Sequence, residues 1–309
     1  MPDHNSTPDE ISRRRFIEST TLAVGAIAGV FAEQATAQPP SSGAPDSQGA
    51  ELVDTHVYVS RWPFRRVPGD ELPDLVRGLK GHGVTSAWAG SFDALLHQDI
   101  AAVNARLAEE CKAQKEIELL PFGAVNPMLP DWEEDLRRCH EVHQMRGVRL
   151  HPDFHGYALA EPRFERLLEL ATRRGLIVQI GLGMEDPRLQ PPLARVPPVN
   201  PEPLVELLPK FPQSRVVLLN FWRSFRTVRG LSMRLSRLPQ VIFDMATVEG
   251  VAGIESSLEA DASLRLLYGS YAPFYNFGSS WLKLHESVLT PQQLAAIRCG
   301  HARKLLAPA

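Results

Sequence analysis

Cysteine is scarce in this sequence, and neither sign of charge dominates it. The 309 residues include three cysteines, Cys111, Cys139 and Cys299, which lie far apart and form no C-x-x-C pair. They therefore predict neither a disulfide framework nor a zinc knuckle. Lys and Arg number 33 against 36 Asp and Glu, whereas nucleic-acid binding needs clustered cations, so DNA and RNA are not expected as partners. The hydrophobic content of 44% is that of an ordinary globular protein.

Long apolar runs are lacking too. The weakly apolar run at residues 22–32 is too short for the roughly 20 apolar residues that cross a bilayer. It follows Ser12-Arg13-Arg14-Arg15-Phe16-Ile17 and precedes the small residues Ala35-Thr36-Ala37. This arrangement is similar to a bacterial twin-arginine export signal. We therefore expect residues 1–37 to be a signal peptide, used by the twin-arginine export machinery and cleaved after Ala37. The mature protein is then expected in the periplasm or otherwise exported, and not in the membrane.

Residues 38–50 are rich in Pro, Ser and Gly and show no apolar periodicity, which predicts a flexible linker before a folded domain at residues 51–309. Signals that resemble this one carry proteins that fold before export, often around a cofactor. The resemblance thus favours a bound cofactor without identifying one. No repeat, heptad pattern or second apolar span indicates a protein partner.

Short apolar runs alternate with helical segments throughout the expected domain. Eight runs read as strands: 52–59, 85–90, 119–125, 147–151, 177–182, 215–220, 241–245 and 264–270. Helical periodicity or helix-start residues mark 100–114, 132–142, 162–174, 203–210 and 291–306. Eight βα units in about 250 residues predict a single-domain (β/α)₈ TIM barrel. The rival, an open doubly wound sheet that binds a nucleotide, needs a G-x-G-x-x-G turn, and none follows an expected strand.

Four motifs at expected strand ends and near the last residues resemble the amidohydrolase-related family. They are Val53-Asp54-Thr55-His56, Gly147-Val148-Arg149-Leu150-His151-Pro152, Tyr268-Gly269-Ser270 with Pro273, and Gly300-His301-Ala302-Arg303-Lys304-Leu305-Leu306. The resemblance spans residues 51–306. It implies a TIM-barrel hydrolase or decarboxylase with a divalent, zinc-like metal ion at the mouth of the barrel. In that family an H-x-H pair, one or two further His and an Asp hold the ion, which activates a water molecule.

The sequence departs from this ligand pattern at four places. His56 is retained, but Tyr58 replaces the second His of the pair, and Gly181 stands where the fifth strand would supply a His. Asn220 ends the sixth strand and Tyr271 replaces the Asp of the eighth. Because a catalytic ion needs three or four N and O ligands, we expect no metal at the family's usual site. A relocated site that uses His56, His151 and His155 stays open.

Strand-end side chains that face the barrel interior define a candidate pocket, since alternate residues of a strand share a face. Its members are polar: His56, Tyr58, Asn126, Arg149, His151, Gln179, Asn220, Asp244 and Tyr271. We expect catalytic roles for His56, Tyr58, His151 and Tyr271, as acid, base or oxyanion donor. Arg149, Gln179 and Asn220 are expected to bind substrate. The alternative is that these polar residues only satisfy one another.

The loop Arg61-Trp62-Pro63-Phe64-Arg65-Arg66 follows the first strand and adds two expected substrate ligands, Arg61 and Arg65. Its alternating aromatic residues and guanidinium groups could cover the mouth of the barrel and grip a carboxylate or phosphate, or its arginines could pair instead with Asp70, Glu71 and Asp74. In the loop after the fifth strand, Glu185 or Asp186 could serve as a general base or remain solvated.

Three functions follow. The sequence favours an enzyme, a hydrolase, decarboxylase or lyase that acts on a small anionic molecule without the family's metal. A small-molecule binding protein on a degenerate barrel and a metal enzyme with relocated ligands are the alternatives, because a fold alone does not set function. The substrate, the bond cleaved and the oligomeric state stay undetermined.

Overall fold

The structure, a computed structural model, describes residues 51–308 apart from residues 226, 227 and 229. The expected export signal and linker, residues 1–37 and 38–50, lie outside these described residues. Residues 51–309 form one unit of the chain. No helix among the described residues is long and apolar enough to span a membrane.

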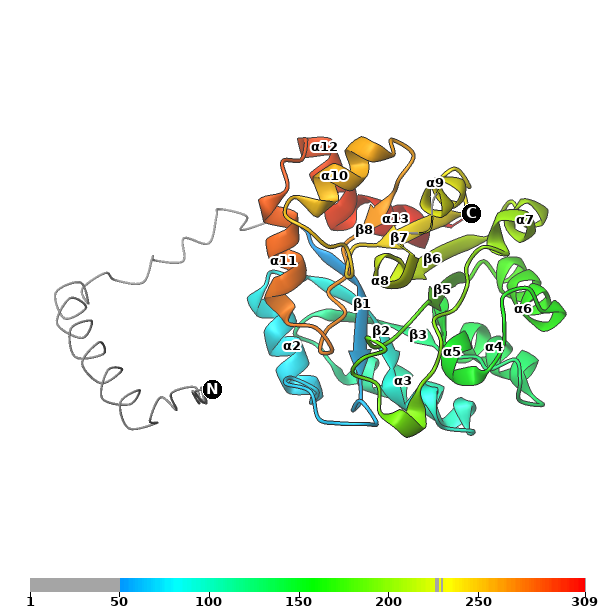
Figure 1. The fold of residues 1–309 in the computed structure, drawn as a ribbon. Coiled ribbons are helices and arrows are strands. Elements are labelled where there is room, and N and C mark those ends of the chain that lie inside the picture. Colours follow the sequence, from blue (N-terminus) through cyan, green and yellow to red (C-terminus); the bar gives the residue numbers. More distant parts are fainter. Residues whose placement is uncertain (1–50, 226–227, 229, 309) are drawn as a thin grey trace, which may run out of the picture. The chain divides into compact units, whose positions relative to one another are not determined.

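Eight parallel strands form the centre of this unit (Figure 1). They are β1 (Val53–Val59), β2 (Ser86–Ser91), β3 (Glu118–Gly123), β4 (Gly147–Leu150), β5 (Ile177–Gly181), β6 (Arg215–Leu219), β7 (Val241–Asp244) and β8 (Leu266–Leu267). Each strand pairs with the next in the chain. The free edge of β1 receives the segment that contains and follows β8: Thr55 N donates to Tyr268 O at 2.9 Å, and Tyr58 N donates to Ala272 O at 2.8 Å. The TIM barrel is therefore confirmed, and the doubly wound sheet is wrong.

Helices connect the strands and lie around the barrel (Figure 1). They are α2 (Leu72–Gly81), α3 (Ile100–Ala113), α4 (Trp132–Glu141), α5 (Pro152–His155), α6 (Pro162–Arg173), α7 (Leu204–Leu207), α8 (Phe221–Phe225), α9 (Leu231–Ser236), α10 (Gly253–Ala260), α11 (Phe277–Glu286), α12 (Pro291–Ala295) and α13 (His301–Leu306). Four short 3₁₀ or π segments complete the described helices, at Phe92–Leu95, Pro192–Ala194, Leu208–Lys210 and Ala296–Gly300.

Three expected elements differ from the structure. The helix expected at 203–210 ends as α7, because Pro209 has no N–H to continue it. The helix expected at 291–306 is interrupted by the π turn Ala296–Gly300. The strand expected at 264–270 shortens to Leu266–Leu267 because neighbouring backbone groups bond elsewhere: Tyr268 N donates to Ile297 O, and Ser270 N donates to the Asp54 carboxylate.

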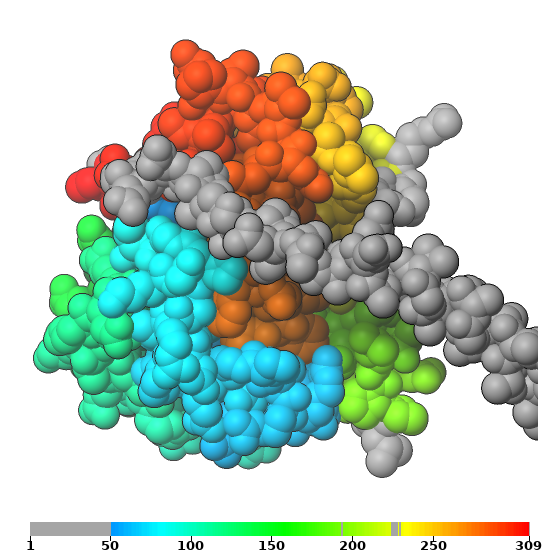
Figure 2. Space-filling model, turned by 90° about the vertical axis from the view of Figure 1, so that its left-hand side faces the viewer, coloured from blue at the N-terminus to red at the C-terminus, as the bar shows by residue number. Residues whose placement is uncertain are grey.

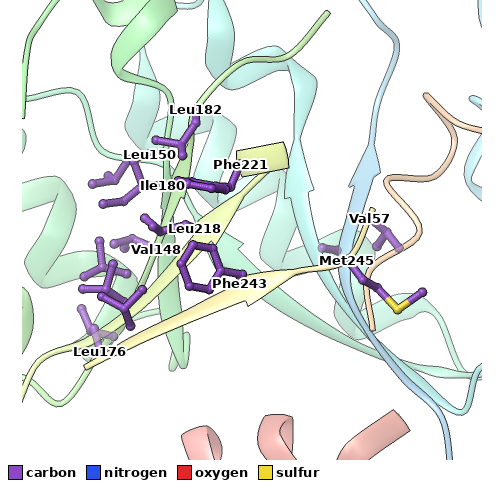
Figure 3. Close-up of a cluster of buried hydrophobic side chains, with 14 of the residues drawn as sticks. Val57, Val148, Leu150, Leu176, Ile180, Leu182, Leu218, Phe221, Phe243 and Met245 are labelled. Atoms are coloured by element: carbon purple, nitrogen blue, oxygen red, sulfur yellow. The ribbon is translucent and has the colours of Figure 1, made fainter. Parts of the chain in front are cut away.

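Apolar side chains fill both sides of the barrel wall. Val148, Ile180, Leu218 and Phe243 point from β4–β7 into the layer between the strands and the helices (Figure 3). A second cluster joins residues of β1, β2, β3, β5, β6, β7 and β8 to α13; it contains Val53, Trp88, Phe122, Ile177, Val217, Leu219, Ile242, Leu267 and Ala302.

Close packing also joins the first and last helical layers. A Cβ added to Gly78 of α2 would lie 2.5 Å from the Phe277 ring of α11, so only glycine fits there. Figure 2 shows the blue and cyan segments around α2 next to the orange segment that contains α11.

Candidate functional site

A histidine–aspartate pair joins β1 to β7 at the carboxyl ends of the strands. His56 Nδ1 lies 2.7 Å from Asp244 Oδ2, and both side chains are fully buried. The other oxygen of Asp244 accepts the backbone N–H of Asn220 at 2.8 Å. Because a carboxylate only accepts hydrogen bonds, Nδ1 of His56 carries the ring proton. His56 Nε2 therefore presents a lone pair, and it is buried without a hydrogen-bond partner.

The protonation state of His56 suits a base. Burial lowers the pKa of His56 below its ordinary value of 6.5, and the charge of Asp244 opposes this shift only in part. The imidazole is therefore neutral at neutral pH and able to take a proton. Asp244 would stabilise the imidazolium that forms.

Two tyrosines surround this imidazole. The Tyr271 ring stacks on His56 with ring centroids 4.5 Å apart, and its hydroxyl donates to Met184 O at 2.5 Å. The Tyr58 hydroxyl lies 3.1 Å from His151 Nε2. Burial raises the pKa of both phenols, so each remains a neutral hydrogen-bond donor. The structure thus brings together His56, Tyr58, His151 and Tyr271, the four residues that the sequence predicts as catalytic.

Unusual backbone conformations occur directly after three of the strands. Ser60 after β1, Asn220 after β6 and Tyr271 in the segment after β8 have φ angles of 62°, 59° and 58°. This left-handed region is disfavoured for a side chain as bulky as that of Tyr271. Hydrogen bonds hold two of them there, from Tyr271 N to His56 O and from Asn220 Nδ2 to Gly183 O. Such strain concentrates at functional sites, and at Tyr271 it accompanies the stacking of the ring on His56.

Arg149 and Gln179 lie below this centre and contact the barrel wall. Arg149 donates to Gln179 Oε1 at 2.8 Å, to Val57 O at 2.5 Å and to Trp88 O at 2.9 Å. Gln179 in turn donates to Thr55 O at 2.9 Å. The donors that sequence reasoning assigns to substrate thus meet the protein itself. Their substrate-binding role stays a prediction, as does that of Asn220.

Asp54 is a second buried carboxylate next to the centre. Its Oδ1 accepts the backbone N–H groups of His56 and Ser270, at 3.1 and 3.0 Å, while its Oδ2 has no partner. Burial raises the pKa of Asp54 to about 6, although these hydrogen bonds and the charge of Arg149 oppose the shift. By accepting both N–H groups, Asp54 holds the backbone of β1 at His56 close to the segment that follows β8.

Aromatic side chains cover the polar centre. We call Trp62, Phe64, Phe92, Phe154 and Phe274 the aromatic cover; they come from the loops after β1, β2, β4 and β8. The Trp62 ring contacts the other four at centroid distances of 5.0 to 6.1 Å. Beneath this layer every predicted catalytic residue is at most 1% exposed. The predicted catalytic residues are therefore closed off from solvent in this structure.

One ion pair connects two loops at the rim of the aromatic cover. Arg65 Nη1 lies 2.7 Å from Glu185 Oε1, which joins the loop after β1 to the loop after β5. The Glu185 side chain is only 2% exposed, against 46% for Arg65, and burial raises the pKa of Glu185. The Arg65 guanidinium also lies 5.2 Å from the centre of the Phe274 ring.

The other arginines of this loop turn away from the centre. Arg61 pairs with Glu71, and Arg66 pairs with Asp70 at 2.6 Å and with Glu71. These contacts match the pairing that sequence reasoning held open as the alternative, and the substrate-binding role of Arg61 stays a prediction. Asn126 also lies apart, in the loop after β3, where its side chain accepts the Met128 N–H at 3.0 Å.

The donors at this site do not fit the divalent ion of the family. His56 could still offer Nε2 to an ion, because a carboxylate on Nδ1 is what orients a metal-binding histidine, but Tyr58 and Tyr271 replace two of the family's ligands. His151 and His155 bond instead to Tyr58 and to Ala94 O. Within the described part of the chain, no group of three or more His, Cys, Asp or Glu is placed to hold a metal ion.

Sequence reasoning missed two parts of the site and most of a third. It placed Asp244 in the pocket without recognising that it orients His56, and it gave Asp54 no role. Two signals were available in the sequence. Asp244 lies near the end of an expected strand, and Asp54 precedes His56 by two residues. The aromatic residues after β1, Trp62 and Phe64, were expected over the mouth. Phe92, Phe154 and Phe274 come from three other segments, and only their contacts with Trp62 in space show that they belong to the cover.

Fold and site together define a TIM-barrel protein whose polar centre lies at the carboxyl ends of its strands. The chain belongs to the amidohydrolase family, since the family model described as Amidohydrolase matches residues 53–307. No curated protein sequence matches it significantly.

Solved structures share the fold at low sequence identity. 2,6-Dihydroxybenzoate decarboxylase from Rhizobium superposes with a TM-score of 0.61 at 14% identity, over 84% of this chain and 98% of that one. 5-Carboxyvanillate decarboxylase from Novosphingobium aromaticivorans, with bound manganese, superposes with a TM-score of 0.63 at 12% identity, over 85% of this chain and 98% of that one. Dihydroxybenzoic acid decarboxylase from Polaromonas, with manganese and 2-nitroresorcinol, superposes with a TM-score of 0.58 at 15% identity, over 84% of this chain and 96% of that one.

Proposed function

We propose that this protein is an exported enzyme of the amidohydrolase family that hydrolyses a small anionic organic molecule without the family's divalent ion. One observation carries the proposal: His56 is held by Asp244 in the tautomer that leaves Nε2 as a bare base, at the end of the barrel where TIM-barrel enzymes react. The pair has the orientation and charge that general-base catalysis needs.

The chemistry follows from this arrangement. A water molecule bound at His56 Nε2 gives up its proton to the imidazole as its oxygen attacks the carbonyl carbon of the substrate. Asp244 stabilises the imidazolium. The Tyr58 hydroxyl, turned away from His151, donates to the developing oxyanion. The imidazolium then returns the proton to the leaving group as the bond to it breaks, which restores the neutral histidine.

Decarboxylation is the second reaction that the same centre allows. The structural neighbours named above include decarboxylases of aromatic carboxylates. In such a reaction neutral His56 first takes a proton from solvent; the bond between carbon and the carboxylate then breaks, CO₂ leaves, and the carbon takes that proton from the imidazolium, which restores the neutral histidine. Assays that detect CO₂ release and assays that detect hydrolysis products separate the two.

The positively charged side chains around the site favour an anionic substrate. Arg65 is half-exposed at the rim of the aromatic cover, and the charges of Arg149 and Arg223 both act on His56. A substrate carboxylate that binds Arg65 would displace Glu185 and release the loop after β5. The aromatic rings beside Arg65 would then contact the apolar part of the substrate.

The decisive experiment replaces Asp244 by Asn. The Asn amide would donate to His56 Nδ1, so the ring proton moves to Nε2 and the base is lost. Turnover is screened on small esters, amides, lactones and carboxylates that carry a negative charge. We expect Asp244→Asn and His56→Ala to lose at least about a thousandfold in kcat, while His97→Ala, an exposed histidine, keeps full activity. Nitrogen NMR of the His56 ring verifies the tautomer, and unchanged turnover in Asp244→Asn would refute the proposal.

A binding protein is the second candidate. The observation that favours it is the complete burial of the polar centre beneath the aromatic cover. In that case a small anionic ligand would be recovered chemically unchanged from the purified protein after hours of incubation. Release of an altered product would exclude this function.

Export is part of the proposal and rests on residues 1–37. Replacing Arg13 and Arg14 by Lys should retain the protein in the cytoplasm, whereas Arg15→Lys should not. Cell fractionation measures the difference, and export of the double variant would show that another route is used.

A further inference from the structure

A cavity of about 210 Å³ lies at the amino-terminal end of the barrel, opposite the site described above. It is a partly open cavity lined by the end of α4, by the segments that lead into β4, β5 and β6, and by the end of α13. Four basic side chains line it: His140, Arg146, Arg174 and Arg215. None of its lining residues, all within the described part of the chain, is Asp or Glu.

The positive charges there are not compensated. Burial and the charge of Arg146 both lower the pKa of Arg215, which shows that the two guanidinium groups act on each other. Arg174 Nε is buried without a hydrogen-bond partner. Among the described ion pairs none includes Arg146, Arg174 or Arg215. Clustered cations with unused donors repel one another unless an anion joins them.

The backbone holds two of these arginines in place. Arg215 Nη1 donates to Leu305 O at 2.6 Å and to Ala307 O at 3.0 Å, and Arg174 Nη1 donates to Leu170 O at 3.3 Å. No hydrogen bond within the described residues uses the Nη2 atoms of these two residues. Planar guanidinium groups bind phosphate and carboxylate through paired hydrogen bonds.

We propose that this cavity binds a small oxyanion of the phosphate class, held by Arg146, Arg174 and Arg215. The volume is several times the roughly 30 Å³ share of one water molecule, so it admits a tetrahedral anion with a few waters and not a large cofactor. The bound anion would tie the start of β6 and the end of α6 to the end of α13. It therefore acts on the stability of the barrel and not on the chemistry at His56.

Titration of the full chain with inorganic phosphate tests the proposal. Calorimetry at constant ionic strength, with chloride as the balancing anion, should show one phosphate per chain. We expect Arg146→Gln and Arg174→Gln each to weaken binding by about tenfold or more, because each removes a charge-assisted hydrogen bond. Arg195→Gln removes the same charge from an exposed position in the loop after β5 and should bind like the parent. Equal binding of sulfate supports a site for tetrahedral oxyanions.

Thermal unfolding separates a ligand site from a structural cluster. A hundredfold excess of phosphate over its Kd should raise the Tm of the parent by about 5 °C or more, and that of Arg146→Gln much less. In chloride alone Arg146→Gln should unfold at the same or a higher temperature than the parent, since a repulsive charge is gone. A lower Tm in chloride with an unchanged phosphate response, or no phosphate binding by the parent, would overturn the proposal.

Discussion

The buried charge of Asp54 lowers the free energy of unfolding of the protein, and this effect can be measured. Its pKa is about 6 in the folded protein against an ordinary value of 3.8. A difference of about 2 units corresponds to about 3 kcal/mol of folding free energy, at 1.36 kcal/mol per unit. The pKa is raised, so the folded state holds the proton more tightly than the unfolded state between these two values. Stability therefore falls as the pH rises from 3.8 to 6, and the full penalty is present above pH 6.

Asp54→Asn removes this charge and keeps an oxygen that can accept the N–H groups of His56 and Ser270. We expect the variant to be more stable than the parent at pH 8, by up to about 3 kcal/mol, and to match it near pH 4, where Asp54 is also neutral. Urea unfolding at pH 4, 5, 6 and 8 measures the difference. Asp131→Asn, at an exposed position before α4, is the control and should show no comparable gain. A variant that is less stable than the parent at pH 8, or a difference that does not change with pH, would refute the reasoning.

Four further predictions concern the site. Gly90→Ala places a Cβ 2.8 Å from the Arg149 guanidinium and should destabilise the fold by about 1–3 kcal/mol in urea unfolding, whereas Gly81→Ala, which meets no atom within 4 Å, should not. The lowered pKa of His56 places the acid limb of kcat/KM below pH 6.5, with activity rising as the base loses its proton; a midpoint above pH 7 would contradict a buried neutral base. Glu185→Gln weakens the ion pair with Arg65, so acrylamide should quench tryptophan emission more strongly, and this increase should vanish when Trp62 is replaced by Phe. Elemental analysis of protein purified without chelator should find metal well below one ion per chain; one zinc, manganese or iron per chain that His56→Ala loses would restore metal-bound water as the nucleophile.

Hydrophobic periodicity was sufficient to predict the barrel, because eight short runs can be buried together in few ways. It predicted the strand ends less well. At β8 a side chain, Asp54, and the carbonyl of Ile297 bind backbone groups that a longer strand would have used. Such competition involves residues more than 200 positions apart in the case of Asp54 and Ser270, and no local pattern records it.

The catalytic candidates could be predicted because strand alternation places His56, Tyr58 and His151 on the inner face. The roles of the arginines could not. A guanidinium has the same sequence signature whether it faces a substrate, as proposed for Arg65, or hydrogen-bonds backbone carbonyls inside the barrel, as Arg149 does. Only the positions of the acceptors distinguish the two.

The pairing of β1 also has a consequence during synthesis of the chain. Thr55 bonds to Tyr268, 213 residues further along, and α13 packs beneath the strands only after that. A nascent chain on the ribosome therefore carries β1 with one unpaired edge until nearly the whole domain has been translated. Such edges join other chains readily. Because this closing contact joins residues so far apart in the chain, we expect final closure of the ring to be a late and slow step of folding.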